Sequence, residues 1–133
     1  MPKYVDGFVV PVPKKKVDAY RKLARGSAKI WREHGAISVV ECVADDVPYG
    51  KVTSFPRSVE RKNSETVVFS WITYKSRADR DKVNAKVMAD PRLEKFMQDA
   101  GQLMDPARMI FGGFDPLVVR NASIEGDLSA LRR

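Results

Sequence analysis

The sequence predicts an α+β domain in which a four-stranded antiparallel sheet carries helices on one face. Three observations lead to this prediction. Four segments are rich in β-branched and aromatic residues, longer segments between them repeat with the helical period, and their order along the chain is β-α-β-β-α-β. Right-handed crossovers convert that order into a sheet with the strands arranged fourth, first, third, second.

The first part of the chain predicts a strand, a helix and a second strand. Residues 4–11 (YVDGFVVP) alternate and contain several β-branched and aromatic side chains, which favours a strand. Residues 14–34 change to the helical period, and Gly35 supplies the left-handed residue that ends many helices. One face of this helix is predicted to carry Val17, Tyr20, Ala24, Ser27 and Trp31. Residues 36–44 (AISVVECVA) predict the second strand.

The middle of the chain predicts a long connection followed by the third strand. Residues 45–56 contain two prolines and a glycine, which favours a loop or a wide hairpin arm. Residues 57–65 (RSVERKNSE) are charged and polar, and we expect them to be the most mobile stretch of the domain. Residues 66–75 (TVVFSWITYK) have the strongest strand composition in the chain.

The last part of the chain predicts helices, a fourth strand and a tail. Ser76 with Asp79 resembles a capping box, which predicts a helix over residues 77–89. Asp90-Pro91 is expected to interrupt it before a short helix over 92–98, and residues 107–115 predict the fourth strand. The complete order is that of a ferredoxin-like domain over residues 1–116, followed by a tail over 117–133.

Composition restricts the class of protein further. A chain of 133 residues with 44% hydrophobic and 31% charged residues fits one globular domain. Its apolar runs are too short to span a bilayer, and early charges argue against a signal peptide, so we expect a cytoplasmic protein without membrane contact. One cysteine and one histidine exclude an intramolecular disulfide and the usual metal sites, so the sequence predicts no metal and no cofactor.

Aromatic residues in the strands predict self-association. Phe8, Phe69, Trp71 and Phe111 are expected on the sheet face that two helices leave uncovered. A large exposed apolar face usually marks an interface. We therefore expect a homodimer that forms through the open sheet face.

The net charge of +7 is concentrated in the first helical segment, since residues 1–35 hold a surplus of six positive charges. One face of this helix is predicted to carry Lys14, Arg21, Arg25 and Arg32. Such a stripe could bind an anionic partner such as RNA. The face has no interleaved aromatic residues and no nucleic-acid motif, so nucleic acid is not the favoured partner.

Two charged residues interrupt apolar strand segments, Asp6 in the first strand and Arg108 at the start of the fourth. Because the topology makes these strands neighbours, we expect an Asp6–Arg108 ion pair, as buried charges need partners. The pair could be a structural salt bridge that fixes register, or a polar anchor for a ligand.

Glu41 interrupts the second predicted strand between Val40 and Cys42. If it is desolvated, its raised pKa would suit a general base, and it is the one candidate catalytic residue. The alternation equally allows it to point to solvent from an edge strand. A small molecule in a cleft between sheet and helices is the favoured function, and the residues expected nearest that cleft or the dimer interface are Asp6, Glu41, Trp71, Tyr74 and Arg108.

Five segments of the chain, in order, resemble the YbaA-like family of uncharacterised bacterial proteins. They are YVDGFVVPVP (4–13), VVECVADDVPYGKVT (39–53), VVFSWITY (67–74), ADPR (89–92) and RMIFGGF (108–114). The resemblance covers about Tyr4 to Phe114 and implies a dimeric α+β barrel built from ferredoxin-like subunits. It implies no particular reaction, so whether the protein is an enzyme stays open.

Overall fold

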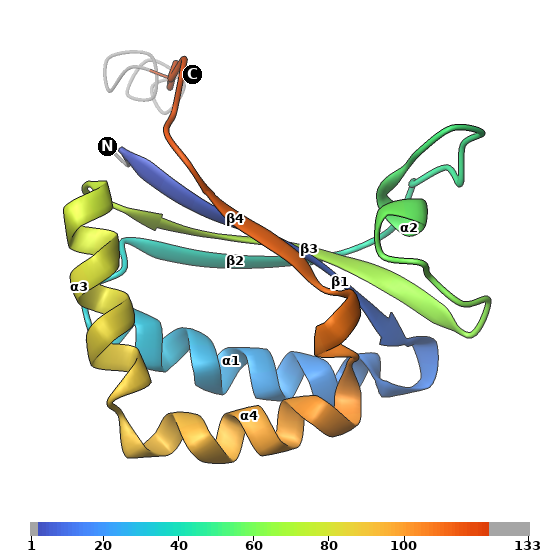
Figure 1. Cartoon of the computed structure of the whole chain (residues 1–133), viewed down its shortest axis with the longest axis horizontal. Helices are drawn as coiled ribbons and strands as arrows, with labels where there is room; N and C mark the ends of the chain where they lie inside the picture. Colours follow the sequence, from blue (N-terminus) through green and yellow to red (C-terminus); the bar gives the residue numbers. More distant parts are fainter. Residues whose placement is uncertain (1–2, 123–133) are drawn as a thin grey trace, which may run out of the picture.

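The computed structural model describes residues 3–122 and contains a four-stranded antiparallel sheet in the order β2-β3-β1-β4 (Figure 1). This confirms the predicted topology. The strands are β1 (Tyr4–Pro13), β2 (Ser38–Val43), β3 (Glu65–Tyr74) and β4 (Ile110–Phe114). The helices are α1 (Val17–Glu33), α2 (Phe55–Ser58), α3 (Arg77–Met88) and α4 (Pro91–Leu103), with short 3₁₀ turns η1 (Lys14–Lys16) and η2 (Pro106–Arg108).

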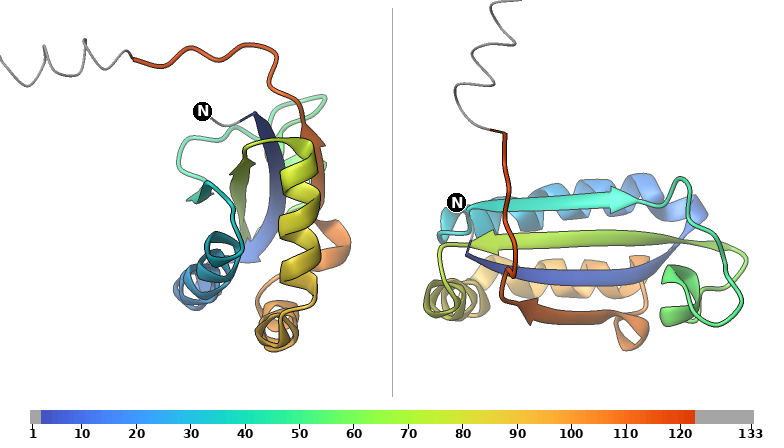
Figure 2. Two further views of the ribbon diagram at one scale, coloured as in Figure 1. Left: turned by 90° about the vertical axis from the view of Figure 1, so that its left-hand side faces the viewer. Right: turned by 90° about the horizontal axis from the view of Figure 1, so that it is seen from above.

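The long helices α1 and α4 lie side by side beneath one face of the sheet, and α3 lies at one end (Figures 1 and 2). The other face is open along most of its length. Alternate residues of β1 point to the helices, from Tyr4 through Phe8 to Val12, because successive side chains of a strand alternate between faces. The main core forms between this face and α1, α3 and α4, where Ile30, Tyr74 and Val87 are buried.

Two local sequence signals have a different outcome from the one expected. Asp90-Pro91 separates two helices as predicted, but the second is longer than the expected 92–98, because the Asp90 side chain accepts a hydrogen bond from the Arg92 amide and caps a helix that runs to Leu103, α4. Asp105 caps η2 in the same way, so the fourth strand begins only at Ile110. Both segments therefore use an Asp-Pro pair as a helix start.

The polar stretch expected to be mobile contributes to the core. Ser54 caps the single turn of α2, which has Pro56 in its first turn. Val59 follows and is 1% exposed, packed on the otherwise open sheet face against Val9 and Val67. The stretch is therefore attached to the sheet by a buried hydrophobic side chain.

The expected placement of four aromatic residues on the open face is half wrong. Phe69 and Trp71 do lie there, with ring centres 5.5 Å apart. Phe8 and Phe111 are paired across β1 and β4 on the helix-facing side, with ring centres 6.3 Å apart. The register decides this. Phe8 pairs with Ser70, so both point to the helices, whereas Phe69 and Trp71, on either side of Ser70 in β3, point to the open face.

Residues 117–122 have no regular secondary structure and leave the end of β4 on the open side of the sheet (Figure 1). Leu117 is 96% exposed. The rest of the predicted tail lies outside the described residues, so the division at residue 116 stays a prediction. Within residues 3–122, no helix is long and apolar enough to cross a membrane.

Candidate ligand-binding cavity

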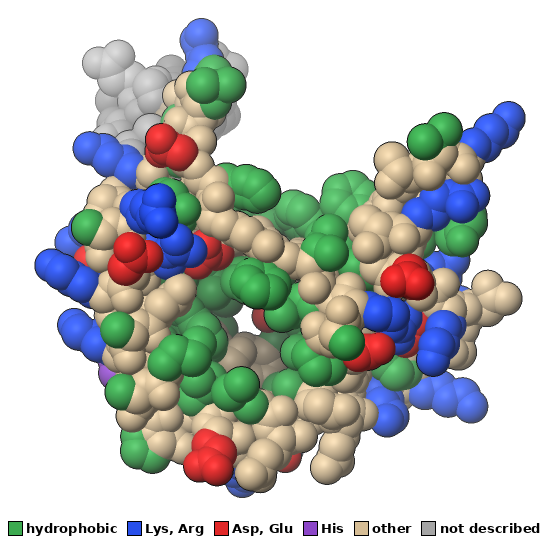
Figure 3. Space-filling view, in the orientation of Figure 1, with side chains coloured by type: hydrophobic (Ala, Val, Ile, Leu, Met, Phe, Trp, Pro, Cys, Tyr) green, Lys and Arg blue, Asp and Glu red, His purple; other side chains and the backbone are tan. Residues whose placement is uncertain are grey.

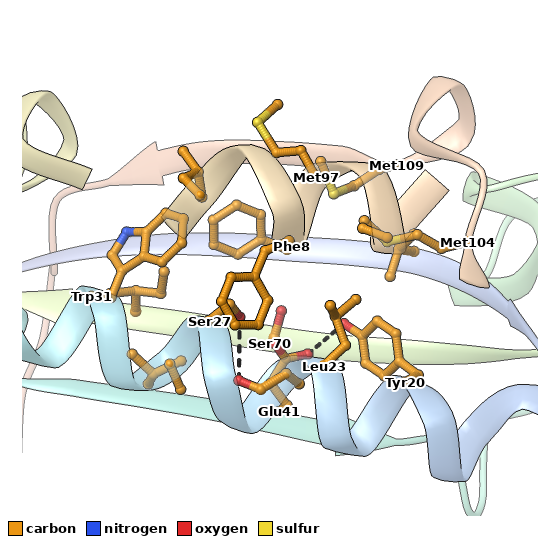
Figure 4. A pocket seen from close by; sticks show the side chains of 18 residues that line it. Phe8, Tyr20, Leu23, Ser27, Trp31, Glu41, Ser70, Met97, Met104 and Met109 are labelled. Atoms are coloured by element: carbon orange, nitrogen blue, oxygen red, sulfur yellow. Dashed lines mark hydrogen bonds between the residues drawn. The ribbon is translucent and has the colours of Figure 1, made fainter. Parts of the chain in front are cut away.

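A cavity of about 200 Å³ lies between the sheet and the helices α1 and α4 (Figure 4). Most of its lining is hydrophobic, including Phe8, Leu23, Trp31 and Phe96. The space-filling view shows an opening into the molecule below β4, framed by hydrophobic side chains (Figure 3). The fold therefore encloses an apolar space with access from the surface.

Small side chains on the two helices leave this space unfilled. Ala24, Ser27 and Ala28 face the cavity from α1, and Ala100 faces it from α4. At Gly26 the opposite holds, since a Cβ atom there would lie 2.5 Å from the Phe96 ring. Glycine at this point allows α1 and α4 to pack closely while the alanines keep the sheet side hollow.

Glu41 of β2 is the one acidic or basic side chain among the described residues that line the cavity. The Tyr20 hydroxyl of α1 donates a hydrogen bond of 2.6 Å to Glu41 Oε1. Burial raises the pKa of the Glu41 carboxyl group, and the hydrogen bond from Tyr20 partly opposes this effect. Burial and the adjacent carboxylate raise the pKa of Tyr20, so Tyr20 remains a hydrogen-bond donor.

The position of Glu41 on the edge strand explains why it is both exposed and desolvated. Its outer side borders a second groove between α1 and β2, whose lining includes Arg21 and Arg25. Its carboxyl group reaches the wall of the cavity, where Tyr20 holds it. The raised pKa reflects the surroundings of the carboxyl group, whereas the exposure reflects the open side of the strand.

Ser70 adds a second polar group beside Glu41. The two residues are direct partners across β2 and β3, which places their Cβ atoms about 5 Å apart on the same face. Ser70 is only 7% exposed, and its hydroxyl forms no hydrogen bond with another described residue. Figure 4 shows both side chains at the cavity, next to the Tyr20–Glu41 hydrogen bond.

Methionine side chains form the part of the wall opposite Trp31. Met97 of α4 is 63% exposed, while Met104 and Met109 flank η2 and are partly buried (Figure 4). Methionine is flexible and polarizable, so such a wall adapts to ligands of different shape.

The expected Asp6–Arg108 ion pair is wrong. Asp6 is buried on the helix-facing side of the sheet and accepts a hydrogen bond of 2.7 Å from Arg80 of α3. Its neighbour on β4 is Gly113, because antiparallel pairing places the end of β4 beside the start of β1 and Arg108 at the opposite end. Burial raises the pKa of Asp6, although the charge of Arg80 acts in the opposite direction.

Arg108 forms its own ion pair at the other end of the sheet. Its guanidinium binds both carboxylate oxygens of Glu65, at 2.8 and 2.7 Å, and its Nε binds Asp105 at 2.9 Å. The hydrogen bonds from Arg108 lower the pKa of Glu65 to about 2. Neither Asp6 nor Arg108 lines the cavity.

Two further candidates, Tyr74 and Trp71, do not line the cavity either. Tyr74 is fully buried beside it, and its hydroxyl lies 3.4 Å from Oδ1 of Asn84. Burial and the nearby Asp6 carboxylate raise the pKa of Tyr74. Trp71 lies on the open face of the sheet. Of the candidates from the sequence, the structure therefore places only Glu41 in the cavity.

The basic face of α1 is partly engaged in local contacts. Arg21 forms an ion pair of 2.5 Å with Asp18, and Arg32 donates a hydrogen bond to the carbonyl oxygen of Ala36. Lys14 and Arg25 are exposed, and no ion pair joins them to another described residue. Two of the four predicted anion-binding side chains are thus held within α1 and its C-terminal turn.

Metal-binding geometry is not found in the part of the chain that the structure describes, where no group of three His, Cys, Asp or Glu side chains is close enough to hold an ion. Tyr20 and Ser70 were not among the expected site residues. The helical period did place Tyr20 on the buried face of the first helix with Ser27 and Trp31, and that face was the available signal.

Comparison with known proteins identifies the family. The family model described as "Protein of unknown function (DUF1428)" matches residues 3–105. The chain belongs to this family. "Uncharacterized protein YbaA" of Escherichia coli K12 is 51% identical over 118 residues, which cover 87% of this chain and 97% of the relative. The family resemblance seen in the sequence is confirmed.

Solved structures of low sequence identity share the fold. A putative antibiotic biosynthesis monooxygenase from Bacillus cereus has a TM-score of 0.58 at 10% identity, covering 92% of this chain and 100% of the other. A nipsnap family protein with unknown function from Agrobacterium tumefaciens has a TM-score of 0.55 at 14% identity, covering 86% and 88%. SnoaB, a cofactor-independent oxygenase from Streptomyces nogalater, has a TM-score of 0.56 at 9% identity, covering 88% and 96%. These likenesses confirm the ferredoxin-like α+β fold.

Proposed function

We propose that this protein binds a small, mostly apolar molecule in the cavity between the sheet and the helices α1 and α4. The observation that carries the proposal is an apolar space of about 200 Å³ with the Glu41 carboxyl group in its wall. Ligand sites are typically apolar cavities with a few placed polar groups. The solved proteins of similar fold include two described as an oxygenase or a putative monooxygenase, which supports a small-molecule role.

Glu41 is the candidate for chemistry in this site. A carboxylate with a raised pKa in an apolar pocket suits a general base near neutral pH. Tyr20 holds it by one oxygen and leaves the other free of hydrogen bonds to described residues. We propose Glu41 as the residue that contacts the ligand, whether the protein only binds that ligand or also transforms it.

Filling the cavity tests the proposal. The probe is 1-ethyl-4-methylbenzene, an uncharged hydrocarbon, and binding is read as a rise in melting temperature with probe concentration. Ala28→Phe places a ring in the cavity and should abolish the rise, while Ala85→Phe on the exposed side of α3 should leave it intact. An equal rise in the protein and in Ala28→Phe would overturn the proposal.

We also propose that the open sheet face binds a second copy of the chain. This face carries Phe69 (39% exposed), Ile110 (45%) and Phe114 (58%), with Trp71 between them. Hydrophobic side chains gather in the hollow between the arm that holds α2 and the tail (Figure 3). From Val5 to Pro11, Ser38 to Cys42, Val67 to Thr73 and Ile110 to Phe114, no charged side chain points to this face. An uncharged apolar patch is complementary to itself, as a two-fold interface requires.

Sedimentation equilibrium at micromolar concentration tests the dimer. The expected species has twice the chain mass of 15.0 kDa. Ile110→Lys should shift it to the monomer, since it places a charge in the apolar patch of each copy, whereas Val52→Lys, at a residue 93% exposed on the arm, should not. A monomer for the unaltered protein would refute the dimer but leave the cavity proposal standing.

A further inference from the structure

The polar groups in the cavity wall restrict the class of ligand more than the apolar side chains do. Tyr20 occupies one oxygen of Glu41, which leaves Oε2 as an acceptor without a partner among the described residues. Beside it, the hydroxyl of Ser70 is also without a partner, although the residue is only 7% exposed. Glu41 is exposed, and the Ser70 hydroxyl is not fully enclosed by protein atoms, so both groups can form hydrogen bonds with a molecule in the cavity.

We propose that Glu41 and Ser70 recognise a hydroxyl group, so that the cavity takes a neutral, largely apolar molecule that carries one alcohol, phenol or enol hydroxyl. A hydroxyl donates one hydrogen bond and accepts others. Its proton would bind Glu41 Oε2, and its oxygen would accept the proton of Ser70 Oγ. The inference rests on the proposed function, since it assigns the class of ligand to the same cavity.

Other polar groups fit the same place less well. A carboxylate or phosphate would face the negative charge of Glu41 in a largely apolar space, where like charges repel strongly. An ammonium group would gain an ion pair with Glu41, but its three donors must all be desolvated in a space whose remaining walls are largely apolar. A buried cation with an unsatisfied donor is costly even beside a carboxylate. A neutral hydroxyl satisfies both protein groups and leaves no donor unpaired.

The position of the pair sets the orientation of the ligand. Glu41 and Ser70 lie on the central part of β2 and β3, next to α1, whereas Met97, Met104 and Met109 lie on the other side of the cavity (Figure 4). The hydroxyl therefore binds against the sheet beside Tyr20. The apolar part of the molecule extends toward the methionines, whose flexible side chains adapt to its shape.

Two probes of nearly equal shape test this assignment, 4-ethylphenol and 1-ethyl-4-methylbenzene, which has a methyl group in place of the hydroxyl. Titration calorimetry measures both dissociation constants at pH 7. A hydrogen bond to a charged group predicts that the phenol binds the unaltered protein at least about tenfold more tightly. The difference between the two dissociation constants should come from the hydroxyl group, since the apolar contacts of the two probes are alike.

Variants locate the hydroxyl site. Glu41→Leu and Ser70→Ala should each remove most of the preference for the phenol and still bind the hydrocarbon, which also shows that they are folded. Glu94→Leu is the matched control, because Glu94 is exposed on α4 and does not line the cavity. It should retain the preference of the unaltered protein.

The possible results separate the two proposals. If both probes bind the unaltered protein equally, or if both variants retain the preference, the hydroxyl assignment is overturned while the cavity remains a binding site. If neither probe binds the unaltered protein, the proposed function is overturned together with the assignment. A preference that is lost in both variants and retained in Glu94→Leu supports the assignment.

Discussion

The ion pair between Glu65 and Arg108 should contribute a large and pH-dependent share of stability. Arg108 holds both oxygens of Glu65 at 2.8 and 2.7 Å, and the two side chains are only 15% and 7% exposed. The pKa of Glu65 falls from 4.5 to about 2. At about 1.4 kcal/mol per pH unit, this corresponds to about 3 kcal/mol at neutral pH. Glu65→Gln should lower the free energy of unfolding by about that amount.

The pH dependence gives the sharper test. Because the folded-state pKa of Glu65 is depressed, its contribution is complete above the unfolded value of 4.5 and is lost as the pH falls toward about 2. Urea denaturation between pH 7 and pH 2.5 should therefore show the unaltered protein and Glu65→Gln converging below pH 4.5. A difference that is absent at pH 7, or that does not shrink on acidification, would refute the reasoning.

A control and a double variant isolate the pair. Asp105→Asn removes the exposed carboxylate that binds the same guanidinium, and it should cost less because solvent screens that contact. The double variant Glu65→Gln with Arg108→Met should recover part of the loss, since no buried charge is left alone.

Three further outcomes are expected. Glu41→Gln should stabilise the protein at pH 7. The folded-state pKa of Glu41 is raised, so the protein loses stability as the pH rises through that pKa, and the neutral glutamine avoids this loss. The gain, measured by urea denaturation, should therefore shrink toward pH 4. Gly113→Ala should lower stability by about 1–3 kcal/mol, because its Cβ would lie 2.3 Å from the Tyr4 hydroxyl, and an unchanged thermal midpoint would contradict this packing. Removal of residues 120–133 should leave the melting temperature within about 8 °C of the intact chain, and a larger fall would make the tail a packed element.

The sheet topology could be predicted from sequence because few arrangements satisfy its constraints. Strand composition gave four strands, and right-handed crossovers left one order for them. The Asp6–Arg108 pair failed because the two strands are antiparallel: Asp6 lies near the start of β1 and pairs with Gly113 near the end of β4, whereas Arg108 precedes β4 and lies near the end of β1. There the Asp105-Pro106 cap starts β4 at Ile110, and Arg108 binds Glu65. Strand ends are set by local capping, which residue composition describes poorly.

The cavity could be predicted only in part. The alternation of β2 left two directions open for Glu41, and the register with Ser70 selects the helix-facing one. The helical period placed Ala24 and Ser27 on one face of the first helix. Whether small side chains leave a space or let the helix approach the sheet depends on the distance between elements. That distance is set by long-range packing, such as Gly26 against Phe96, which a single sequence does not reveal.

Three acidic residues lie in strands, and two of them differ from Glu41 in how their charge is compensated. Asp6 and Glu65 each accept a hydrogen bond of 2.7 Å from an arginine, Arg80 and Arg108, so each buried charge is compensated within the fold. Glu41 forms no ion pair with another described residue, and its hydrogen bond comes from the neutral hydroxyl of Tyr20.

A carboxylate with a raised pKa destabilises the folded protein at neutral pH. An uncharged side chain could pack equally well at the position of Glu41, since Val39 and Val43, its neighbours on the same face of β2, are hydrophobic. Under the proposed function, a ligand that binds the free oxygen of Glu41 offsets the stability that this carboxylate costs.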